Sequence, residues 1–323
     1  LPGTPPLTPF GAVTDQRWFA YLAREAGGGV VDEVNFWQPR ALQPMRRMSP
    51  GTPVFFKLKS PANCIAGYGF FASFHRMPVA DAWSVFGWKN GDESPTSFLG
   101  RIGGYRGEDL SRSENAAGLF GCNLLRDAHF WPESRWIPFG EAQGWHRNIV
   151  QGRDETDPAR VALLLSRIAG DAAAVPAELA PRFQLVATDG RRFDDRPVVL
   201  REGQGVFRVR TLEAYDRRCA ISGERTEPVL DAAHIQPYLG PASNHVQNGI
   251  ALTKEWHALY DAGLVAITPD YRVRVSRLIR DRWSNGRRYY ERDGEPITEP
   301  REPANRPSPE ALAWHLDRVF KAG

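Results

Sequence analysis

The chain has 323 residues, of which 42% are apolar and 24% are charged, and its formal net charge is +3. These values are typical of a folded globular protein of about two domains, and they exclude a disordered, collagen-like or repeat-dominated chain. No apolar run approaches the roughly 18 residues that a membrane span needs. Residues 1–13 carry neither a basic leader nor a long apolar run, so we expect a soluble, cytoplasmic protein.

Three cysteines are scattered along the chain, at Cys64, Cys122 and Cys219. Their odd number makes a disulfide framework a poor fit, and no CxxC pair is present to hold a structural zinc ion. We therefore expect three buried thiols in a reducing compartment and no structural zinc.

Residues 1–150 are expected to form a β-rich domain, because short apolar runs bounded by Gly and Pro fill this region. Residues 53–59 (PVFFKLK) and 63–74 (NCIAGYGFFASF) are predicted strands. Residues 79–88 have the apolar spacing of a short helix packed on that sheet.

Residues 151–202 are expected to be a linker that contains a helix. Asp157 followed by Pro158 is typical of a helix start, residues 159–170 (ARVALLLSRIAG) are helical in pattern, and Gly170 can end the helix. Residues 203–323 then change in character, to a helix, short strands and turns.

The strongest chemical pattern lies at residues 229–264. We predict a short strand that ends near His234, a Pro/Gly/Asn loop, and a second strand that opens at Asn248. Thr253 is then placed to cap a helix that carries His257, and Gly263 to end it. Such a strand-loop-strand-helix unit brings His234, Asn248 and His257 together.

This unit resembles the HNH endonuclease family, which has a ββα-metal fold. The matching segments include LDAAHIQPY, QNGIAL and HALYDAGL, within a similarity to predicted bacterial restriction endonucleases over about residues 203–320. The resemblance implies that His234 is a general base, that His257 binds a divalent cation such as Mg²⁺ or Mn²⁺, and that Asn248 pins the loop that orients His234. Ni²⁺ or Zn²⁺ are further metals for the site in vitro.

Two departures from the family pattern concern the metal. Many relatives place a metal ligand directly before the catalytic histidine, where this chain has Ala233. Asp231 lies on the same side of the strand, and it is either a second metal ligand or the acceptor of a backbone hydrogen bond. Relatives also carry paired zinc knuckles, whereas here Cys219 stands alone and hydrophobic packing must replace them.

Further charged residues surround the motif. Glu255 and Asp261 are expected to make local or outer-sphere contacts on the helix. Residues 272–292 hold eight arginines against two acidic residues, a local charge of +6. Such a stripe suits phosphate contacts that read no sequence. The residues predicted to contact the DNA backbone are Arg272, Arg274, Arg277 and His245. The remaining histidines, His75, His129, His146 and His315, are expected to be structural.

The segment 35–71 is similar to PUA-superfamily folds, such as EVE and SRA-like domains, through Phe36-Trp37, the MSPG turn and a strand ending in Gly-Tyr-Gly-Phe. The similarity implies a β-barrel with an aromatic pocket for a base flipped out of DNA. Its predicted lining is Asn35, Phe36, Trp37, Tyr68, Trp83 and Trp88, with Asp32 as another reader of the base edge. The alternative is that these aromatics form an ordinary core.

Together, these features predict an α+β protein with a PUA-like barrel, a helical linker and a ββα-metal nuclease domain. The functional hypothesis is a modification-dependent endonuclease that binds double-stranded DNA with a modified cytosine such as 5-methylcytosine, and that cuts as a homodimer. The alternatives are a nonspecific or toxin-like HNH nuclease whose first half binds a protein, a modified-nucleic-acid binding protein, and an RNA substrate.

Overall fold

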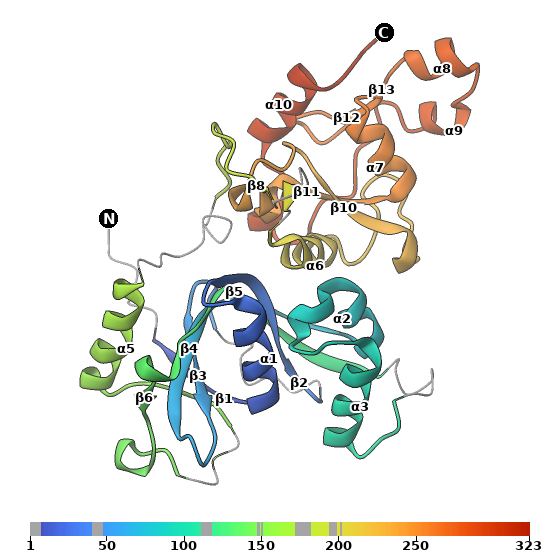
Figure 1. The fold of residues 1–323 in the computed structure, drawn as a ribbon. Helices are drawn as coiled ribbons and strands as arrows, with labels where there is room; N and C mark the ends of the chain where they lie inside the picture. Colours follow the sequence, from blue (N-terminus) through green and yellow to red (C-terminus); the bar gives the residue numbers. More distant parts are fainter. Residues whose placement is uncertain are drawn as a thin grey trace. The chain divides into compact units, whose positions relative to one another are not determined.

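The computed structural model describes residues 8–40, 48–110, 118–146, 149, 151–171, 182–193, 199–200 and 202–323. The chain forms two compact units, residues 1–176 and 177–323, and each is described by itself (Figure 1). The predicted α+β class is confirmed. Within the described ranges, no helix has both the length and the apolar character needed to span a membrane.

The first unit is built around one large sheet. Its strands are β1 (Phe10–Thr14), β2 (Val30–Gln38), β3 (Pro53–Leu58), β4 (Cys64–Pro78), β5 (Leu119–Phe130), β6 (Ile137–Pro138) and β7 (Arg153–Asp154). Its helices are α1 (Gln16–Ala26), α2 (Val79–Phe86), α3 (Pro95–Arg106) and α5 (Pro158–Gly170). The predicted strands at 53–59 and 63–74 and the predicted helix at 79–88 correspond to β3, β4 and α2.

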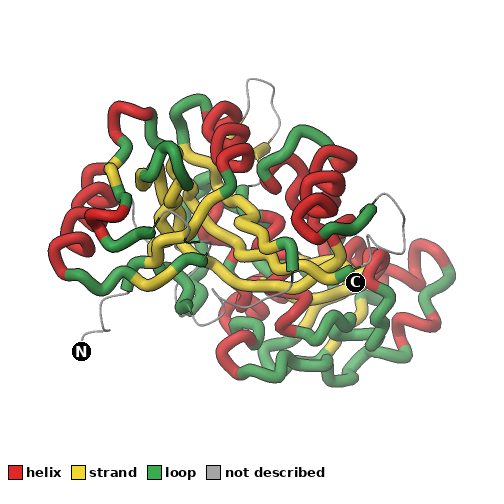
Figure 2. The backbone as a smooth tube through the Cα atoms, turned by 90° about the horizontal axis from the view of Figure 1, so that it is seen from below, coloured by secondary structure: helices red, strands yellow, loops and turns green. Residues whose placement is uncertain are grey.

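The strand order of this sheet is β2-β5-β4-β3-β1-β7, and β6 pairs with β4. β1 runs parallel to β3, and the other pairs are antiparallel. Figure 2 shows these strands as one twisted layer. Among the described residues, no pairing joins β2 to β7, so the predicted closed barrel is replaced by an open sheet.

β4 is the central long strand of the sheet and is bent by two irregularities in its pairing with β5. Gly67 lies just before the first of them, which falls between Tyr68 and Phe70, and it pairs with Phe130. A Cβ at this position would lie 2.1 Å from the carbonyl oxygen of His129, so only glycine permits this approach of the two strands.

The helix predicted in the linker packs on the first unit. Asp157 caps α5 by accepting a hydrogen bond from the backbone of Arg160 over 2.9 Å, as the sequence predicts. Leu164 and Ile168 of α5 are buried in a cluster with Trp131 and other aromatics. Parts of the predicted linker, residues 172–181, 194–198 and 201, lie outside the described residues.

The second unit contains short strands and helices. The strands are β8 (Arg192–Phe193), β9 (Val199–Leu200), β10 (Leu230–His234), β11 (Gly249–Thr253), β12 (Val265–Ile267) and β13 (Val273–Val275). The helices are α6 (Gln204–Ala214), α7 (Lys254–Asp261), α8 (Leu278–Trp283), α9 (Arg287–Tyr290) and α10 (Pro309–Arg318).

β10, β11 and α7 form the predicted ββα arrangement. β10 and β11 pair antiparallel from Leu230 opposite Thr253 to His234 opposite Gly249. Thr253 is at the N-cap position of α7, as predicted, but its side chain makes no capping hydrogen bond. The helix is held instead by packing of its apolar face.

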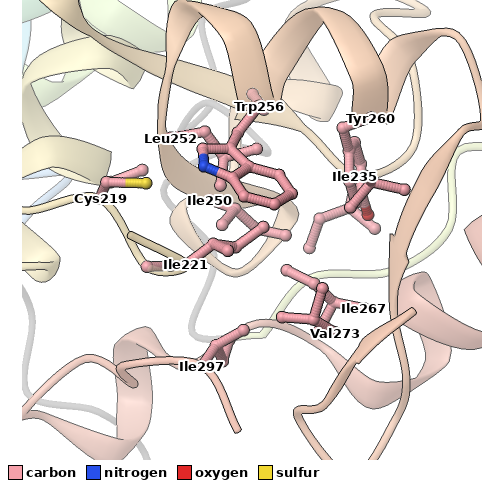
Figure 3. Packing of buried hydrophobic residues seen from close by; sticks show 14 of the residues in the cluster. Cys219, Ile221, Ile235, Ile250, Leu252, Trp256, Tyr260, Ile267, Val273 and Ile297 are labelled. Carbon is pink, nitrogen blue, oxygen red and sulfur yellow. The ribbon is translucent and has the colours of Figure 1, made fainter. Parts of the chain in front are cut away.

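That apolar face belongs to the core of the second unit (Figure 3). Trp256 and Tyr260, one helical turn apart on α7, are both buried in the cluster that includes Ile250 and Leu252 of β11. Burial of one such aromatic side chain stabilises the fold by about 2–3 kcal/mol. Cys219 is fully buried in the same cluster, and Cys64 and Cys122 are buried in the first unit.

Candidate active site

His234 ends β10, and two neighbours define the position of its ring. Its imidazole stacks on the ring of Phe207 from α6, with ring centroids 3.9 Å apart and an interplanar angle of 12°. Its Nε2 atom lies 3.0 Å from Oδ1 of Asn244. The stacking partner and the amide together fix both the plane and the rotation of the imidazole.

The hydrogen bonds of Asn244 determine which nitrogen of His234 carries the proton. Nδ2 of Asn244 donates to the carbonyl oxygen of Glu202 over 2.6 Å, so Oδ1 is the atom that faces His234. An amide oxygen only accepts, and Nε2 must therefore be the donor. In the neutral imidazole, the basic lone pair is then on Nδ1.

Asn248 joins the two sides of the loop between β10 and β11. Its Oδ1 accepts from the backbone N–H of Gln236 over 2.8 Å, and its Nδ2 donates to the carbonyl oxygens of Gln236 and Ser243. The side chain is fully buried. These contacts are the geometry that a loop-pinning residue requires, because Gln236 follows His234 by two residues.

His257 lies on α7 between two carboxylates. Its Nδ1 is 3.0 Å from Oδ2 of Asp231 on β10, and its Nε2 is 3.3 Å from Oδ2 of Asp261, one helical turn later. The other oxygen of Asp231 accepts from the backbone of Ala232 over 2.9 Å. Both carboxylate oxygens of Asp231 are thus engaged on the protein itself.

The pKa of the Asp231 carboxyl is lowered from its ordinary value. Partial burial alone would raise this pKa, but the hydrogen bond and the charge of His257, with the backbone of Ala232, outweigh that effect. Asp231 is therefore an ionised carboxylate that receives the Nδ1–H of His257. This arrangement is the usual outer-sphere support of a metal-binding histidine.

His234, His257 and Asp261 line one pocket of about 220 Å³ together with Tyr238 and His315. His315 stacks on Tyr260, with centroids 3.8 Å apart. Burial lowers the pKa of His315 to about 4, so it is neutral at physiological pH. The pocket thus brings the imidazole of His234 on β10 together with the imidazole of His257 and the carboxylate of Asp261 on α7.

Four residues were predicted to contact the DNA backbone, and they lie in different environments. Arg272 and Arg274 are exposed and face Asp270 and Asp293 at 3.4 and 3.7 Å. Arg277 is also exposed. His245 is only 2% exposed, and its Nδ1 accepts from the backbone of Gln247. None of the four lines the pocket of His234.

The six residues predicted to form a base pocket make separate packing contacts in the first unit. Asn35 is buried and donates to Oδ1 of Asn90 over 2.9 Å, and Trp37 donates to the carbonyl oxygen of Asn90. The others either pack on aromatic rings or reach solvent: Phe36 on Trp18, Tyr68 on Trp131, Trp83 on Phe98, and Trp88 at the surface. The described pockets are lined by none of these six.

Asn244 and Asp261 have larger roles in the site than the sequence pattern predicts. Asn244 is a polar residue of the loop, and nothing local separates it from its neighbours. Asp261 follows His257 by four residues, and this spacing on a helix is the signal that points to a shared face.

Comparison with known proteins identifies the second unit. The family model described as HNH endonuclease matches residues 219–268, a range that contains β10, β11 and α7. The second unit therefore contains a segment, residues 219–268, that is similar to HNH endonucleases. No curated protein matches the chain.

Solved structures with some similarity include an ASCH protein from Zymomonas mobilis, at 10% identity and a TM-score of 0.31, over 49% of this chain and 94% of that chain. The modification-dependent TagI restriction endonuclease is 12% identical with a TM-score of 0.26, over 90% of this chain and 76% of that chain.

Proposed function

We propose that this chain, whose residues 219–268 match the HNH endonuclease family, is a metal-dependent DNA endonuclease with His234 as its general base. One observation carries the proposal. Asn244 is anchored to Glu202, accepts the proton of Nε2 and leaves the basic lone pair of His234 on Nδ1. Neutral imidazole is the side chain with a pKa suited to removing a proton from water near neutral pH.

The donor set in the pocket fits a hard divalent cation such as Mg²⁺ or Mn²⁺. His257 and Asp261 supply an imidazole and a carboxylate from one face of α7, and Asp231 orients His257 through Nδ1. The described residues hold no cluster of three or more His, Cys, Asp or Glu side chains suited to a metal. Water and phosphate oxygens would complete the coordination, as is common for Mg²⁺.

We assign His257 and Asp261 as metal-binding residues and Asp231 as a positioning residue. The sequence left Asp231 as either a second metal ligand or the acceptor of a backbone hydrogen bond, and its two oxygens contact His257 and the backbone of Ala232. When bound, the cation neutralises charge on the phosphate and on the leaving oxygen.

The protein side chains account for the proton transfer. His234 accepts the proton of the attacking water at Nδ1, and the resulting imidazolium keeps its Nε2–H bond to Asn244. The face of Phe207 holds the ring in plane and shields one side of it from water. Asn248 keeps the loop after His234 in place. General base catalysis of this kind contributes about 10²–10⁴-fold to the rate.

The finer proposal is that the first unit senses a modified cytosine, such as 5-methylcytosine, and selects the DNA that the nuclease domain cuts. It is supported by the similarity of residues 35–71 to PUA-superfamily readers of flipped bases. Because a single ββα module cuts one strand, we propose that a homodimer makes a double-strand break.

Cleavage assays test both the nuclease activity and the preference for modified cytosine. Purified protein with Mg²⁺ or Mn²⁺ is incubated with matched unmodified and cytosine-modified DNA. Metal-dependent cutting that His234→Ala abolishes supports the nuclease, and preference for the modified substrate supports the sensor. Equal cutting of the two substrates would refute modification dependence and leave the nuclease assignment intact.

A further inference from the structure

The first unit contains a groove of about 530 Å³ that the proposed function does not use. It is formed by the start of α1, by the two residues that follow β3, and by one face of α3. Its volume is in the range of pockets that bind nucleotide-sized ligands. Most of its lining residues are exposed at the surface, so the groove can hold part of a longer molecule.

The groove is cationic. Arg17, Lys59 and Arg101 line it, against Asp15 as the single carboxylate. Arg17 and Lys59 are exposed and have no ion-pair partner among the described residues. Arg17 lies on α1 and Lys59 directly follows β3, and both are available to an anion.

The carboxylate of Asp15 is already engaged within the protein. It accepts from the backbone N–H of Trp18 over 2.8 Å, which caps α1, and from the hydroxyl of Tyr105. It also faces the guanidinium of Arg101 at 3.6 Å. The negative charge in the groove is therefore compensated, whereas the charges of Arg17 and Lys59 are not.

Arg101 forms a rigid wall. Its side chain is 9% exposed, contacts Asp92 at 2.5 Å and stacks over Trp37 with its guanidinium carbon 5.4 Å from the ring centre. Its Nε atom is buried and makes no hydrogen bond within the described structure. Tyr105, one turn later on α3, is 50% exposed and presents its ring to the groove.

The floor of the groove is bare helix backbone. α3 contains three glycines, Gly100, Gly103 and Gly104, although glycine is the poorest helix former after proline. Packing explains Gly103, since a Cβ there would lie 2.5 Å from the carbonyl oxygen of Glu108. Packing does not explain Gly100 and Gly104, because a Cβ at either would have nothing within 4 Å. Both line the groove.

We propose that this groove binds a phosphate-and-base unit of a nucleic-acid strand. Arg17 and Lys59 hold the phosphate, and a base lies flat on the backbone of Gly100 and Gly104 beside the ring of Tyr105. Glycine allows this close approach of a planar group to the backbone. The inference rests on the proposed function only in taking nucleic acid as the substrate, and it assigns residues that the predicted base pocket does not contain.

Two sets of variants in the full chain test the groove. Arg17→Gln with Lys59→Gln removes the phosphate contacts. Gly100→Gln with Gly104→Gln fills the floor with uncharged side chains that favour helix, so α3 gains stability while the groove is blocked. Gly170→Gln is the matched control, because Gly170 ends α5, has open space around its Cα and lies outside the groove.

Binding of a fluorescein-labelled 12-nucleotide single-stranded DNA is measured by anisotropy in EDTA, which prevents metal-dependent cutting. We expect each double variant to weaken binding at least tenfold and Gly170→Gln to leave it unchanged. The charge variant should also lower the slope of log K against log salt by about 0.7, because one phosphate is no longer neutralised. The glycine variant should melt no lower than the wild type.

Unchanged binding in both double variants would overturn the proposal. Equal binding of an oligoglutamate peptide would also overturn it, because the groove would then be a site for acidic peptides. These outcomes differ from failure of the nuclease assignment, which would appear as wild-type protein that binds the oligonucleotide and does not cut DNA with metal present.

Discussion

The imidazole of His234 donates from Nε2 to Oδ1 of Asn244 over 3.0 Å, and the amide of Asn244 is held by the carbonyl oxygen of Glu202. The folded structure therefore determines which nitrogen of His234 carries the proton. The histidine alone would exchange between two tautomers, whereas the anchored amide selects the one with a basic Nδ1.

Substitution of Asn244 should therefore change the pH dependence of cleavage. In Asn244→Asp, a carboxylate replaces the amide oxygen beside Nε2–H and stabilises the imidazolium, so the pKa of His234 rises. The acidic limb of the kcat/KM profile should move to higher pH by about one unit or more. Asn244→Leu should lower kcat without such a shift. A profile unmoved in Asn244→Asp would show that the contact does not tune the base.

Removal of the carboxylates beside His257 should weaken metal binding to different degrees. Asp261→Ala deletes a proposed metal ligand. Asp231→Asn changes only the carboxylate that orients His257, and loss of such a partner usually lowers metal affinity by about 10–100-fold. Calorimetric titration of Mn²⁺ into the full chain measures both. Asp317→Ala, an exposed carboxylate on α10, should bind Mn²⁺ like the wild type. A larger loss for Asp231→Asn than for Asp261→Ala would reverse the two roles.

His315 should make the second unit less stable in acid. Its pKa is about 4 in the folded chain and about 6.5 when exposed, so the unfolded state binds the extra proton. The stability that the neutral ring contributes is complete above pH 6.5 and is lost as pH falls toward 4. At pH 5, this difference in proton binding lowers the free energy of unfolding by about 2 kcal/mol.

The variant His315→Phe keeps a ring against Tyr260 and cannot titrate. Urea unfolding of the full chain at pH 7.5 and pH 5 should show a smaller acid-induced loss in His315→Phe than in the wild type. Equal losses in the two proteins would mean that His315 is protonated at little cost in the folded state.

The exposed arginines and His245 should respond differently to substitution. Arg277→Gln removes an exposed cation and should reduce the salt dependence of duplex binding by about 0.9 in slope. His245→Ala removes a side chain that is 2% exposed, so it should lower the melting temperature and leave the slope unchanged. A smaller salt dependence of duplex binding in a fully folded His245→Ala variant would show that His245 contacts the DNA backbone.

The sequence was sufficient for the ββα unit because its information is local. The run from Asp231 to Gly263 carries its own strands, loop and helix, and the spacing of His234, Asn248 and His257 places them on elements that pack on one another. The family match over residues 219–268 agrees with this part of the prediction.

Features that depend on tertiary contacts could not be predicted in the same way. The role of Asn244 depends on the carbonyl oxygen of Glu202, which lies 42 residues earlier. Aromatic residues such as Trp37 and Tyr68 are typical of a pocket wall, but both are buried in the core of the first unit. The local sequence likewise does not distinguish an open sheet from a closed barrel, because closure of the barrel depends on whether the edge strands β2 and β7 pair.

The role of His234 as general base is tested most directly by comparing His234→Ala with the wild type on DNA that the wild type cuts, with Mn²⁺ present. We expect at least a hundredfold loss of cleavage rate in His234→Ala, with DNA affinity in EDTA and the melting temperature unchanged. Cleavage by the folded variant at the wild-type rate would contradict the assignment of His234 as the general base.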